Sequence, residues 1–312
     1  MKLIKPDELA DLTTLSGGRF SVDSIESAFS FCKSLTTSHY ENFPVGSILI
    51  PKKFRKHFYS VYSFARIADD IADESDENSE KRIQYLDNLQ KLILNIDLNK
   101  NNNPMNSKNE VPSNPVILAL AQTMKERNIP SEPFLKLLIA FKRDIYFKQP
   151  ENFDELEDYC HYSANPIGEL VLRIFGLYND TTKPYSDAVC TGLQLVNFWQ
   201  DLSIDLAKGR CYIPHSLLQK YGLTNENLHL SENKLILTQC LNEIYEYTNS
   251  FFIKGRKLFK YLKFYRLKIE IIVTVKGGEK LLGRIRKMNA QIFVKRPELT
   301  KFDFFKILIS SF

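Results

Sequence analysis

The chain has 312 residues, of which 44% are hydrophobic and 25% are charged, a composition typical of a globular protein with a sizeable core. Its formal net charge of +5 is mild, and no run of basic residues is long enough to indicate nucleic-acid binding by itself. An anionic substrate and a membrane surface are equally compatible with this basic excess. No stretch approaches the roughly 18 apolar residues that a membrane-spanning helix needs.

The cysteines and the N-terminal sequence bear on the compartment. Five cysteines are scattered along the chain without a C-x-x-C motif, which favours a reducing, intracellular environment over a disulfide framework. The first residues, MKLIKPDELADL, contain acidic side chains and lack the apolar core of a signal peptide. We therefore expect a cytoplasmic protein, with the inner face of the cell membrane as the one membrane surface open to peripheral contact.

Apolar residues recur with a period of about 3.6, and long alternating patterns are absent, so we predict an all-α fold. A segment rich in Asn, Ser and Pro, at about residues 97–114, is predicted to be a flexible loop between helices. Because helical patterning resumes directly after it, we expect one domain over residues 1–312. The expected helices cover residues 22–37, 52–74, 80–96, 116–127, 131–147, 154–176, 185–208, 215–220 and 232–264, with two or three more before the end.

The expected helix 185–208 carries a polar stripe on an otherwise apolar surface. Five polar residues follow one another at steps of three and four, which at about 100° per residue places them within roughly a quarter of the helix circumference. Two of them, Asp201 and Asp205, form a D-x-x-x-D pair one turn apart. The stripe consists of Gln194, Asn197, Asp201, Asp205 and Lys208.

A second acidic stripe lies on the expected helix 52–74, where Arg66 and Asp70 accompany a further pair, Asp69 and Asp73. Carboxylates one turn apart repel each other, and a bound cation removes the repulsion. One such pair alone is more often a solvated helix face, but two pairs on strongly apolar helices favour a metal site. Paired carboxylates with room for water suit Mg²⁺, which also bridges to phosphate oxygens. The two pairs predict a site for Mg²⁺ and a diphosphate.

A third segment, DYCHYSANPIGELVL at 158–172, combines tyrosines with a glycine inside a helical pattern. Gly168 costs the helix roughly 1 kcal/mol relative to Ala, which indicates room for a chain-like ligand or a close approach of two helices. A tolerated kink after Pro166 is an alternative explanation. Aromatic residues such as Phe43 offer ring faces that stabilise cations, although most aromatic residues at helical spacing simply fill a core.

Together these segments resemble the motifs of the squalene/phytoene synthase family, and the resemblance extends from about residue 25 to 297. YSFARIADDIADE is similar to the first aspartate-rich motif, YCHYSANPIGELVLRIFG to the central tyrosine–glycine segment, and LQLVNFWQDLSIDLAKGRCYIP to the second aspartate-rich motif. Within the family, HYENFPVGS, NFWQD and VKGGEKLL…FVKRPEL resemble the bacterial hydroxysqualene synthases of hopanoid pathways. The usual family motif has Arg just before the second-motif aspartate. Gln200 stands there in this chain, as in that branch, which argues against a phytoene synthase.

The resemblance implies the isoprenoid synthase fold, a single all-α bundle around a central apolar cavity with the aspartate motifs at its mouth. It also implies conversion of presqualene diphosphate and water into hydroxysqualene and diphosphate, in squalene and hopanoid biosynthesis, with about two or three Mg²⁺ ions as cofactor. No NADPH is expected, since no G-x-G-x-x-G segment is present. The implied metal ligands and catalytic residues are Asp69, Asp73, Asp201 and Asp205, with Tyr162 as a further catalytic residue. The implied substrate-binding residues are Phe43, Arg66, Asp70, Gly168, Gln194, Asn197, Lys208, Arg210 and Tyr212.

Two alternative functions stay open at this point. The head-to-head joining of two farnesyl diphosphate molecules, to presqualene diphosphate or squalene, uses the same motifs. A non-catalytic helical assembly factor of the same fold is the alternative outside the enzymes, although such a protein would be free to lose its aspartates. The implied partners are an isoprenoid diphosphate substrate, a presqualene diphosphate synthase and a hydroxysqualene reductase, and no nucleic acid. The C-terminal sequence FDFFKILISSF suits either an anionic membrane interface or a terminal helix on the bundle.

Overall fold

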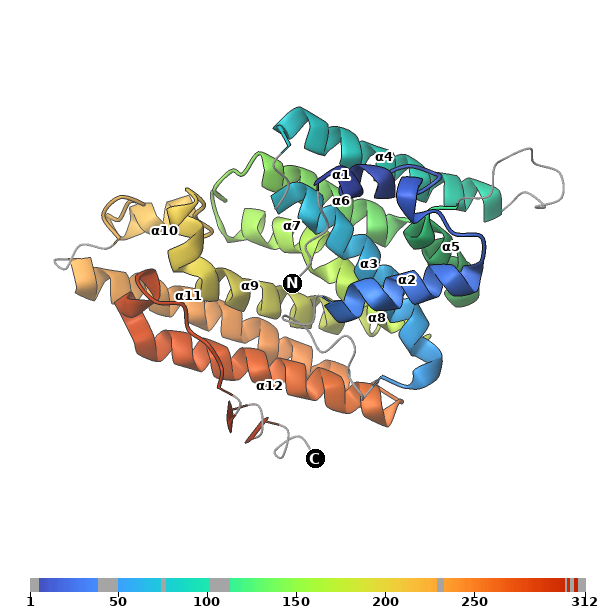
Figure 1. The fold of residues 1–312 in the computed structure, drawn as a ribbon. Helices are drawn as coiled ribbons and strands as arrows, with labels where there is room; N and C mark the ends of the chain where they lie inside the picture. The colour runs from blue at the N-terminus through green and yellow to red at the C-terminus, as the bar shows by residue number, and fades with distance from the viewer. Residues whose placement is uncertain are drawn as a thin grey trace. The chain divides into compact units, whose positions relative to one another are not determined.

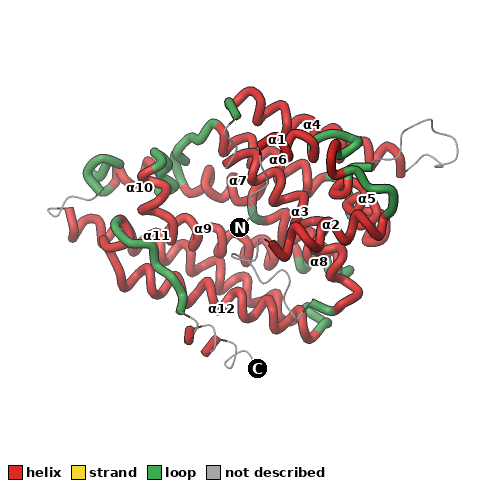
Figure 2. The backbone as a smooth tube through the Cα atoms, in the orientation of Figure 1, coloured by secondary structure: helices red, strands yellow, loops and turns green. Residues whose placement is uncertain are grey.

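The computed structural model contains helices, turns and loops, and no strand in the residues that it describes (Figures 1 and 2). The prediction of an all-α protein is therefore confirmed. In this described part of the chain, no helix combines the length and apolar character that crossing a membrane requires. The structure describes residues 6–38, 50–73, 77–100, 113–228, 233–300, 302–303 and 306–307.

Contacts within the chain group its residues into two compact units. Unit 1 comprises Met1–Tyr146 and Glu169–Tyr178, and unit 2 comprises Phe147–Gly168 and Asn179–Phe312. Each unit is therefore described by itself, and the expectation of a single domain stays a prediction.

Unit 1 is built around helix α3. It packs against α2, α5 and α6, and Phe64 of α3 meets Phe134 of α6 edge-on, with ring centroids 5.4 Å apart. Ile67 and Ile71, one turn apart on α3, are fully buried in this core. The helices of unit 1 are α1 (Pro6–Leu12), η1 (Gly18–Phe20), α2 (Ile25–Ser38), α3 (Lys52–Asp73), α4 (Ser79–Lys100), α5 (Pro115–Arg127) and α6 (Glu132–Ile145).

A buried polar cluster joins α3 to α5 inside unit 1. His57 has no exposed surface, and its Nδ1 lies 3.1 Å from Oγ1 of Thr123, which in turn lies 2.8 Å from Oγ of Ser60. Burial, followed by the nearby Arg127 guanidinium, lowers the pKa of His57 to about 4. The imidazole is therefore neutral near pH 7 and acts as a hydrogen-bonding core residue.

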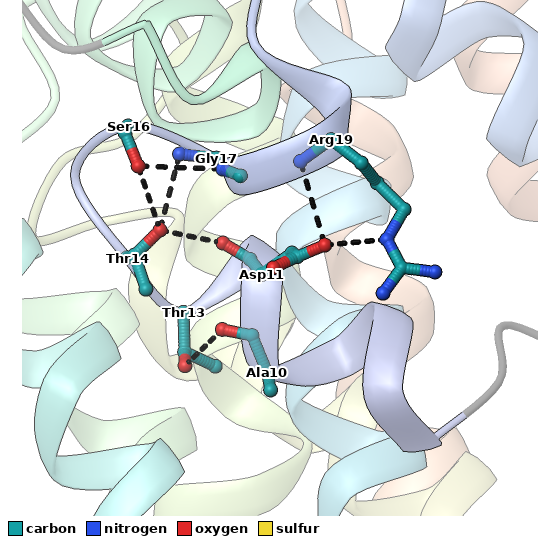
Figure 3. Close-up of polar contacts among 8 residues, drawn as sticks. Ala10, Asp11, Thr13, Thr14, Ser16, Gly17 and Arg19 are labelled. Carbon is teal, nitrogen blue, oxygen red and sulfur yellow. Dashed lines mark hydrogen bonds and ion pairs between the residues drawn. The ribbon is translucent and has the colours of Figure 1, made fainter.

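The turn after α1 is held by short polar contacts (Figure 3). The carboxylate of Asp11 accepts a hydrogen bond from Nε of Arg19 at 2.6 Å, and the backbone carbonyl of Asp11 accepts one from Oγ1 of Thr14 at 2.8 Å. Gly17 has φ +72°, and a Cβ at this position would lie 2.8 Å from Cα of Asn114. The turn therefore requires glycine both for its left-handed backbone and for its contact with the start of α5.

Asn114 connects this turn to α5. Its Oδ1 accepts hydrogen bonds from the backbone N–H groups of Val116 and Ile117, which makes it the N-cap of α5. Its Nδ2 donates to the carbonyls of Leu12 and Thr14, both at 2.8 Å. One fully buried side chain thus satisfies backbone groups of two segments that are far apart in the sequence.

The loop expected at 97–114 differs from the structure at both ends. Helix α4 continues to Lys100, and Asp97, inside it, accepts a hydrogen bond from the backbone N–H of Ser131. Asn114 is a fixed helix cap, as described above. The remainder, residues 101–112, lies outside the described residues.

Unit 2 is organised around helix α9, which packs against α7, α11 and α12. In Figure 1, α11 and α12 run side by side, and the short segment between them turns the chain back. Trp199 on α9 is fully buried, and its Nε1 donates to Oγ1 of Thr248 on α11 at 2.9 Å. The helices of unit 2 are α7 (Phe153–Ser163), α9 (Lys183–Ala207), α10 (His215–Lys220), α11 (Lys234–Gly255), η4 (Arg256–Lys260), α12 (Tyr265–Met288) and η5 (Asn289–Phe293), and α8 (Asn165–Ile174) has residues in both units.

The expected helix 154–176 is two helices, which corrects the prediction. α7 ends at Ser163 and α8 begins at Asn165. Pro166 explains the break, because proline has no backbone N–H to donate to the carbonyl one turn earlier in a continuous helix.

Candidate active site

The first aspartate motif lies on the C-terminal part of α3, and its acidic side chains differ in burial. Asp70 follows the buried Ile67 by three residues, so it shares the inward face of the helix and is only 3% exposed. The side chain of Asp69 is 47% exposed and Asp73 is also exposed. The pair one turn apart, Asp69 and Asp73, is therefore the part of this motif that is open to ligands.

Arg66 neutralises the inward carboxylate of this motif. Its Nη2 lies 2.5 Å from Oδ1 of Asp70, and its Nη1 lies 3.6 Å from Oδ2 of Asp69. Tyr62, one turn earlier, was not singled out from the sequence. Burial raises its pKa, the Arg66 charge opposes that shift, and Asp70 adds to it.

Arg82 of α4 adds a cation at the C-terminal end of α3. Its Nη1 donates to the backbone carbonyl of Ala72 at 2.5 Å, and its Nη2 to Oγ of Ser79 at 3.4 Å. A cation is favourable at a helix C-terminus, where the last carbonyls lack partners within the helix. Sequence reasoning missed this residue, because a single arginine on a neighbouring helix carries no motif.

The polar stripe of α9 lies on the uncovered side of that helix. Asn197 and Lys208 are exposed, and Gln194, Asp201 and Asp205 are partly exposed. The helix buries the opposite side, and its stripe stays accessible to a ligand. The buried apolar residues that alternate with the stripe residues along the sequence are Leu195, Val196, Phe198, Trp199 and Leu202.

Helix α9 ends directly after its acidic pair through a glycine cap. Gly209 has φ +74°, its N–H donates to the carbonyl of Leu206 at 3.0 Å, and the N–H of Arg210 donates to the carbonyl of Asp205 at 2.8 Å. These are the two bonds of a Schellman motif. Lys208 and Arg210 consequently follow the acidic pair at the point where the chain leaves the helix.

An aromatic stack fixes the segment after this cap. The ring of Tyr212 lies parallel to that of Phe198 on α9, with centroids 3.8 Å apart, and Phe147 meets Tyr212 edge-on at 5.1 Å. Tyr159 of α7 lies 5.7 Å from Phe198. Tyr212 is buried, so its ring anchors the segment to α9. No sequence motif points to Phe147, which was expected at the end of the helix 131–147 and lies instead in an irregular stretch after α6.

Asp201 has a partner that the sequence analysis did not identify. Nε of Arg296, far along the chain, donates to Oδ1 of Asp201. The neighbouring Gln200 donates its Nε2 to the backbone carbonyl of Pro297 at 2.8 Å. The sequence could not reveal this contact, because no helical spacing relates residues so far apart.

Gly168 packs against α9. A Cβ on Gly168 would lie 2.5 Å from Oγ of Ser186 and 2.6 Å from Sγ of Cys190, closer than real Cβ atoms come. This geometry is the close approach of two helices that was one of the explanations considered for Gly168. Ser186 precedes Asp201 by about 20 Å along the helix axis, so Gly168 does not lie at the acidic pair of α9.

The two remaining candidates are Tyr162 and Phe43. Tyr162, near the end of α7, is partly exposed, and its ring meets that of His161 edge-on at 5.1 Å. Phe43 lies outside the described residues. Their proposed roles therefore stay predictions.

The donor set is suited to Mg²⁺ but divided between two helices. Both pairs are at least partly exposed and offer carboxylate oxygens, the ligands that Mg²⁺ prefers. In the described part of the chain, no group of three or more His, Cys, Asp or Glu side chains could hold a metal ion. A complete site would need both pairs, and this arrangement stays a prediction.

A cavity of about 510 Å³ lies elsewhere in unit 2, and none of its lining residues is a candidate site residue. Its lining is mixed, and carboxylates and lysines lie beside apolar side chains such as Phe251. It is therefore not the apolar cavity that the family resemblance implies, which stays a prediction. The charged residues of its lining are Asp154, Glu157, Asp158, Lys183, Asp187 and Lys254.

Comparison with known proteins identifies the family. The sequence profile of squalene/phytoene synthases matches residues 36–303. Hydroxysqualene synthase of Sinorhizobium fredii is 33% identical over 79% of this chain and 80% of that protein, and hydroxysqualene synthase of Rhodopseudomonas palustris is 34% identical over 81% and 82%. The crystal structure of squalene synthase HpnC from Alicyclobacillus acidocaldarius matches with a TM-score of 0.76 and 35% identity, covering 85% of this chain and 95% of that one. The chain therefore belongs to the squalene/phytoene synthase family and has its all-α isoprenoid synthase fold.

Proposed function

We propose that this enzyme is a hydroxysqualene synthase, which converts presqualene diphosphate and water into hydroxysqualene and diphosphate. The observation that carries the proposal is the similarity to two hydroxysqualene synthases over about four fifths of each chain. The aspartate pairs on α3 and α9, which are at least partly exposed, add support, because a diphosphate leaving group needs concentrated positive charge, which carboxylates supply by binding metal ions.

Mg²⁺ is the metal that we propose for this site. Asp69 and Asp73 on α3, with Asp201 and Asp205 on α9, would hold the ions. When bound, Mg²⁺ supplies Lewis-acid stabilisation of the departing diphosphate. Lys208 and Arg210, which follow the acidic pair of α9, would add charge-assisted hydrogen bonds to the diphosphate oxygens.

The chemical steps assign further roles to this chain. The carbon–oxygen bond of the diphosphate ester breaks, and its electron pair leaves with the diphosphate. The resulting carbocation rearranges, a water oxygen adds to it, and one proton is released. Gln194 and Asn197 on the stripe would orient water or metal ligands, and Tyr162 would move the proton or stabilise the cation. A presqualene diphosphate synthase would supply the substrate and a hydroxysqualene reductase would consume the product.

The test is product analysis by mass spectrometry. The full chain is incubated with presqualene diphosphate and Mg²⁺ in H₂¹⁸O, without NADPH. We expect hydroxysqualene that carries one ¹⁸O atom, no product after EDTA, and recovery when Mg²⁺ is restored. Full activity in the chelated sample would contradict the metal proposal.

The same assay separates the alternatives. Incubation with farnesyl diphosphate alone would yield presqualene diphosphate or squalene if the head-to-head reaction were the function. Absence of diphosphate release from either substrate would instead indicate a non-catalytic assembly factor.

We also propose peripheral contact of this cytoplasmic enzyme with the inner face of the cell membrane, through its C-terminal tail. Phe302 is 62% exposed, and Nζ of Lys306 lies 4.4 Å from its ring centroid, a pairing suited to an anionic interface. Most of the other apolar tail residues lie outside the described residues. In liposome flotation at low salt, the full chain should float with anionic vesicles and a version ending at Thr300 should not. Equal behaviour of the two proteins would exclude the tail as the anchor.

A further inference from the structure

The segment after η5 lies across the acidic end of α9 within unit 2. We call residues 294–300 the C-terminal strap. It begins where the backbone N–H groups of Val294 and Lys295 donate to the carbonyl of Gln291, the last bonds of η5. From residue 296 to residue 300 the backbone makes no regular secondary structure, so other parts of unit 2 hold the strap.

Two residues of α9 hold the middle of the strap. Gln200 donates to the carbonyl of Pro297 at 2.8 Å, and Pro297 is buried. This bond places the preceding residue, Arg296, against Oδ1 of Asp201. The guanidinium is partly exposed, so water and ions can reach the ion pair.

The far end of the strap is fixed to α12. Arg284 donates to the carbonyl of Glu298 and, at 2.7 Å, to Oδ2 of Asp303. The same carboxylate oxygen accepts from the N–H of Thr300 at 2.8 Å, and Nζ of Lys280 lies 3.4 Å from its other oxygen. The attachment to α12 thus uses several bonds, whereas α9 holds the strap through the Gln200 bond and the Arg296 ion pair.

This geometry assigns the strap a function at the metal site. We propose that Arg296 occupies the position of a cation at Asp201 until a metal ion displaces it, and that Gln200 is the positioning residue that holds Arg296 there. A guanidinium on one oxygen of Asp201 weakens metal binding to this carboxylate, because the two cations repel and both are attracted by the same single negative charge. Metal binding at Asp201 therefore opens the middle of the strap, while α12 retains its far end.

The inference depends on the proposed metal role of Asp201, and it has its own test. Mn²⁺ binding to the full chain is measured by electron paramagnetic resonance, with no substrate present. Because Arg296→Gln removes both the competitor and its charge, its Mn²⁺ affinity should exceed that of the unmodified chain about threefold or more, the scale of a partly exposed ion pair. The matched control is Arg256→Gln, which removes a similar Nε–carboxylate contact with Glu279 and should leave the affinity unchanged.

A second variant separates displacement from a simple charge effect. Gln200→Ala keeps every charge but removes the bond to Pro297, so it should also raise Mn²⁺ affinity. Hydrogen–deuterium exchange of residues 294–300 should increase in this variant, and in the unmodified chain it should increase on addition of Mn²⁺. The backbone of α12 serves as an internal reference that should not change.

The outcomes distinguish the two proposals. If Mn²⁺ binds and Asp201→Ala weakens it, but neither strap variant raises the affinity, the strap inference is wrong and the metal proposal stands. A lower affinity in Arg296→Gln, or unchanged exchange of residues 294–300 on Mn²⁺ binding, also overturns the inference. If neither the unmodified chain nor the variants bind Mn²⁺, the inference fails, and the EDTA experiment decides the metal role separately.

Discussion

The two aspartate motifs have the same spacing but obtain their counter-ions in different ways. On α3, Arg66 lies three and four residues before the carboxylates that it contacts, so the motif contains its own cation. On α9, the cation at Asp201 is Arg296, which comes from a separate segment of unit 2. The first arrangement forms with the helix itself, whereas the second requires the tertiary structure of unit 2.

This difference suggests different tasks for the two motifs. The Arg66–Asp70 pair is largely buried, and breaking it leaves an uncompensated charge inside unit 1. The Arg296–Asp201 pair is partly exposed, so opening it costs little. The Arg66 counter-ion of the α3 motif is therefore expected to stay in place, whereas the Arg296 counter-ion of the α9 motif can be exchanged.

The largest expected effect concerns the acidic pairs that α3 and α9 have in common. Replacing any one of Asp69, Asp73, Asp201 or Asp205 by Ala should reduce turnover by at least about a hundredfold, the scale of losing one electrostatic stabiliser. Turnover of presqualene diphosphate is the measurement. Asp187→Ala, on α9 but outside the stripe, is the control and should retain activity. If only the substitutions on one helix reduced turnover, the two motifs would not contribute equally to catalysis.

The next prediction tests how much the Arg66–Asp70 ion pair on α3 stabilises the fold. Asp70→Ala should lower the free energy of unfolding by about 3 kcal/mol, because it leaves Arg66 without its buried partner. Asp73→Ala, an exposed position on the same helix, should change it by less than about 0.5 kcal/mol. Urea unfolding measures both. Equal effects of the two substitutions would mean that burial does not distinguish these carboxylates.

A smaller effect is expected at the other end of α9. Gly168→Ala should destabilise the fold by about 1–2 kcal/mol, because the new methyl group meets Ser186 and Cys190. Cys190→Ala in that background should recover part of the loss, as thermal unfolding would show. Gly283→Ala on α12, with open space around it, is the control and should stabilise the helix by up to about 1 kcal/mol. Equal shifts at both glycines would rule out the close approach.

A pH-dependent effect is expected from His57 on α3. Its pKa is about 4 in the folded protein, below the ordinary value of 6.5, so the unfolded chain binds a proton first as the pH falls. Stability should therefore decrease between about pH 6.5 and pH 4, and His57→Gln should flatten this slope. Urea unfolding at several pH values measures it. The exposed His215→Gln is the control, and an unchanged slope in His57→Gln would contradict the assignment.

The sequence predicted what depends on helical spacing. The exposed sides of α3 and α9 and most helix positions follow from periodicity, because side chains three and four residues apart share a face. It did not predict Arg296 at Asp201, Arg82 at the end of α3 or Phe147 beside Tyr212. These contacts join residues far apart in the chain, and only tertiary packing determines them. Similarly, the first residues of the loop expected from composition belong to α4, where Asp97 accepts a hydrogen bond from the backbone N–H of Ser131.

The cap at Gly209 and the ring of Tyr212 together have a consequence for insertions and deletions. The glycine fixes the direction in which the chain leaves α9, and the ring stacks on Phe198 within the same helix. The backbone between these two positions is therefore a short loop that is anchored to α9 at both ends and has a fixed length. One added or missing residue would therefore disrupt either the glycine geometry or the aromatic stack. Homologous chains should therefore rarely differ in length between these two positions.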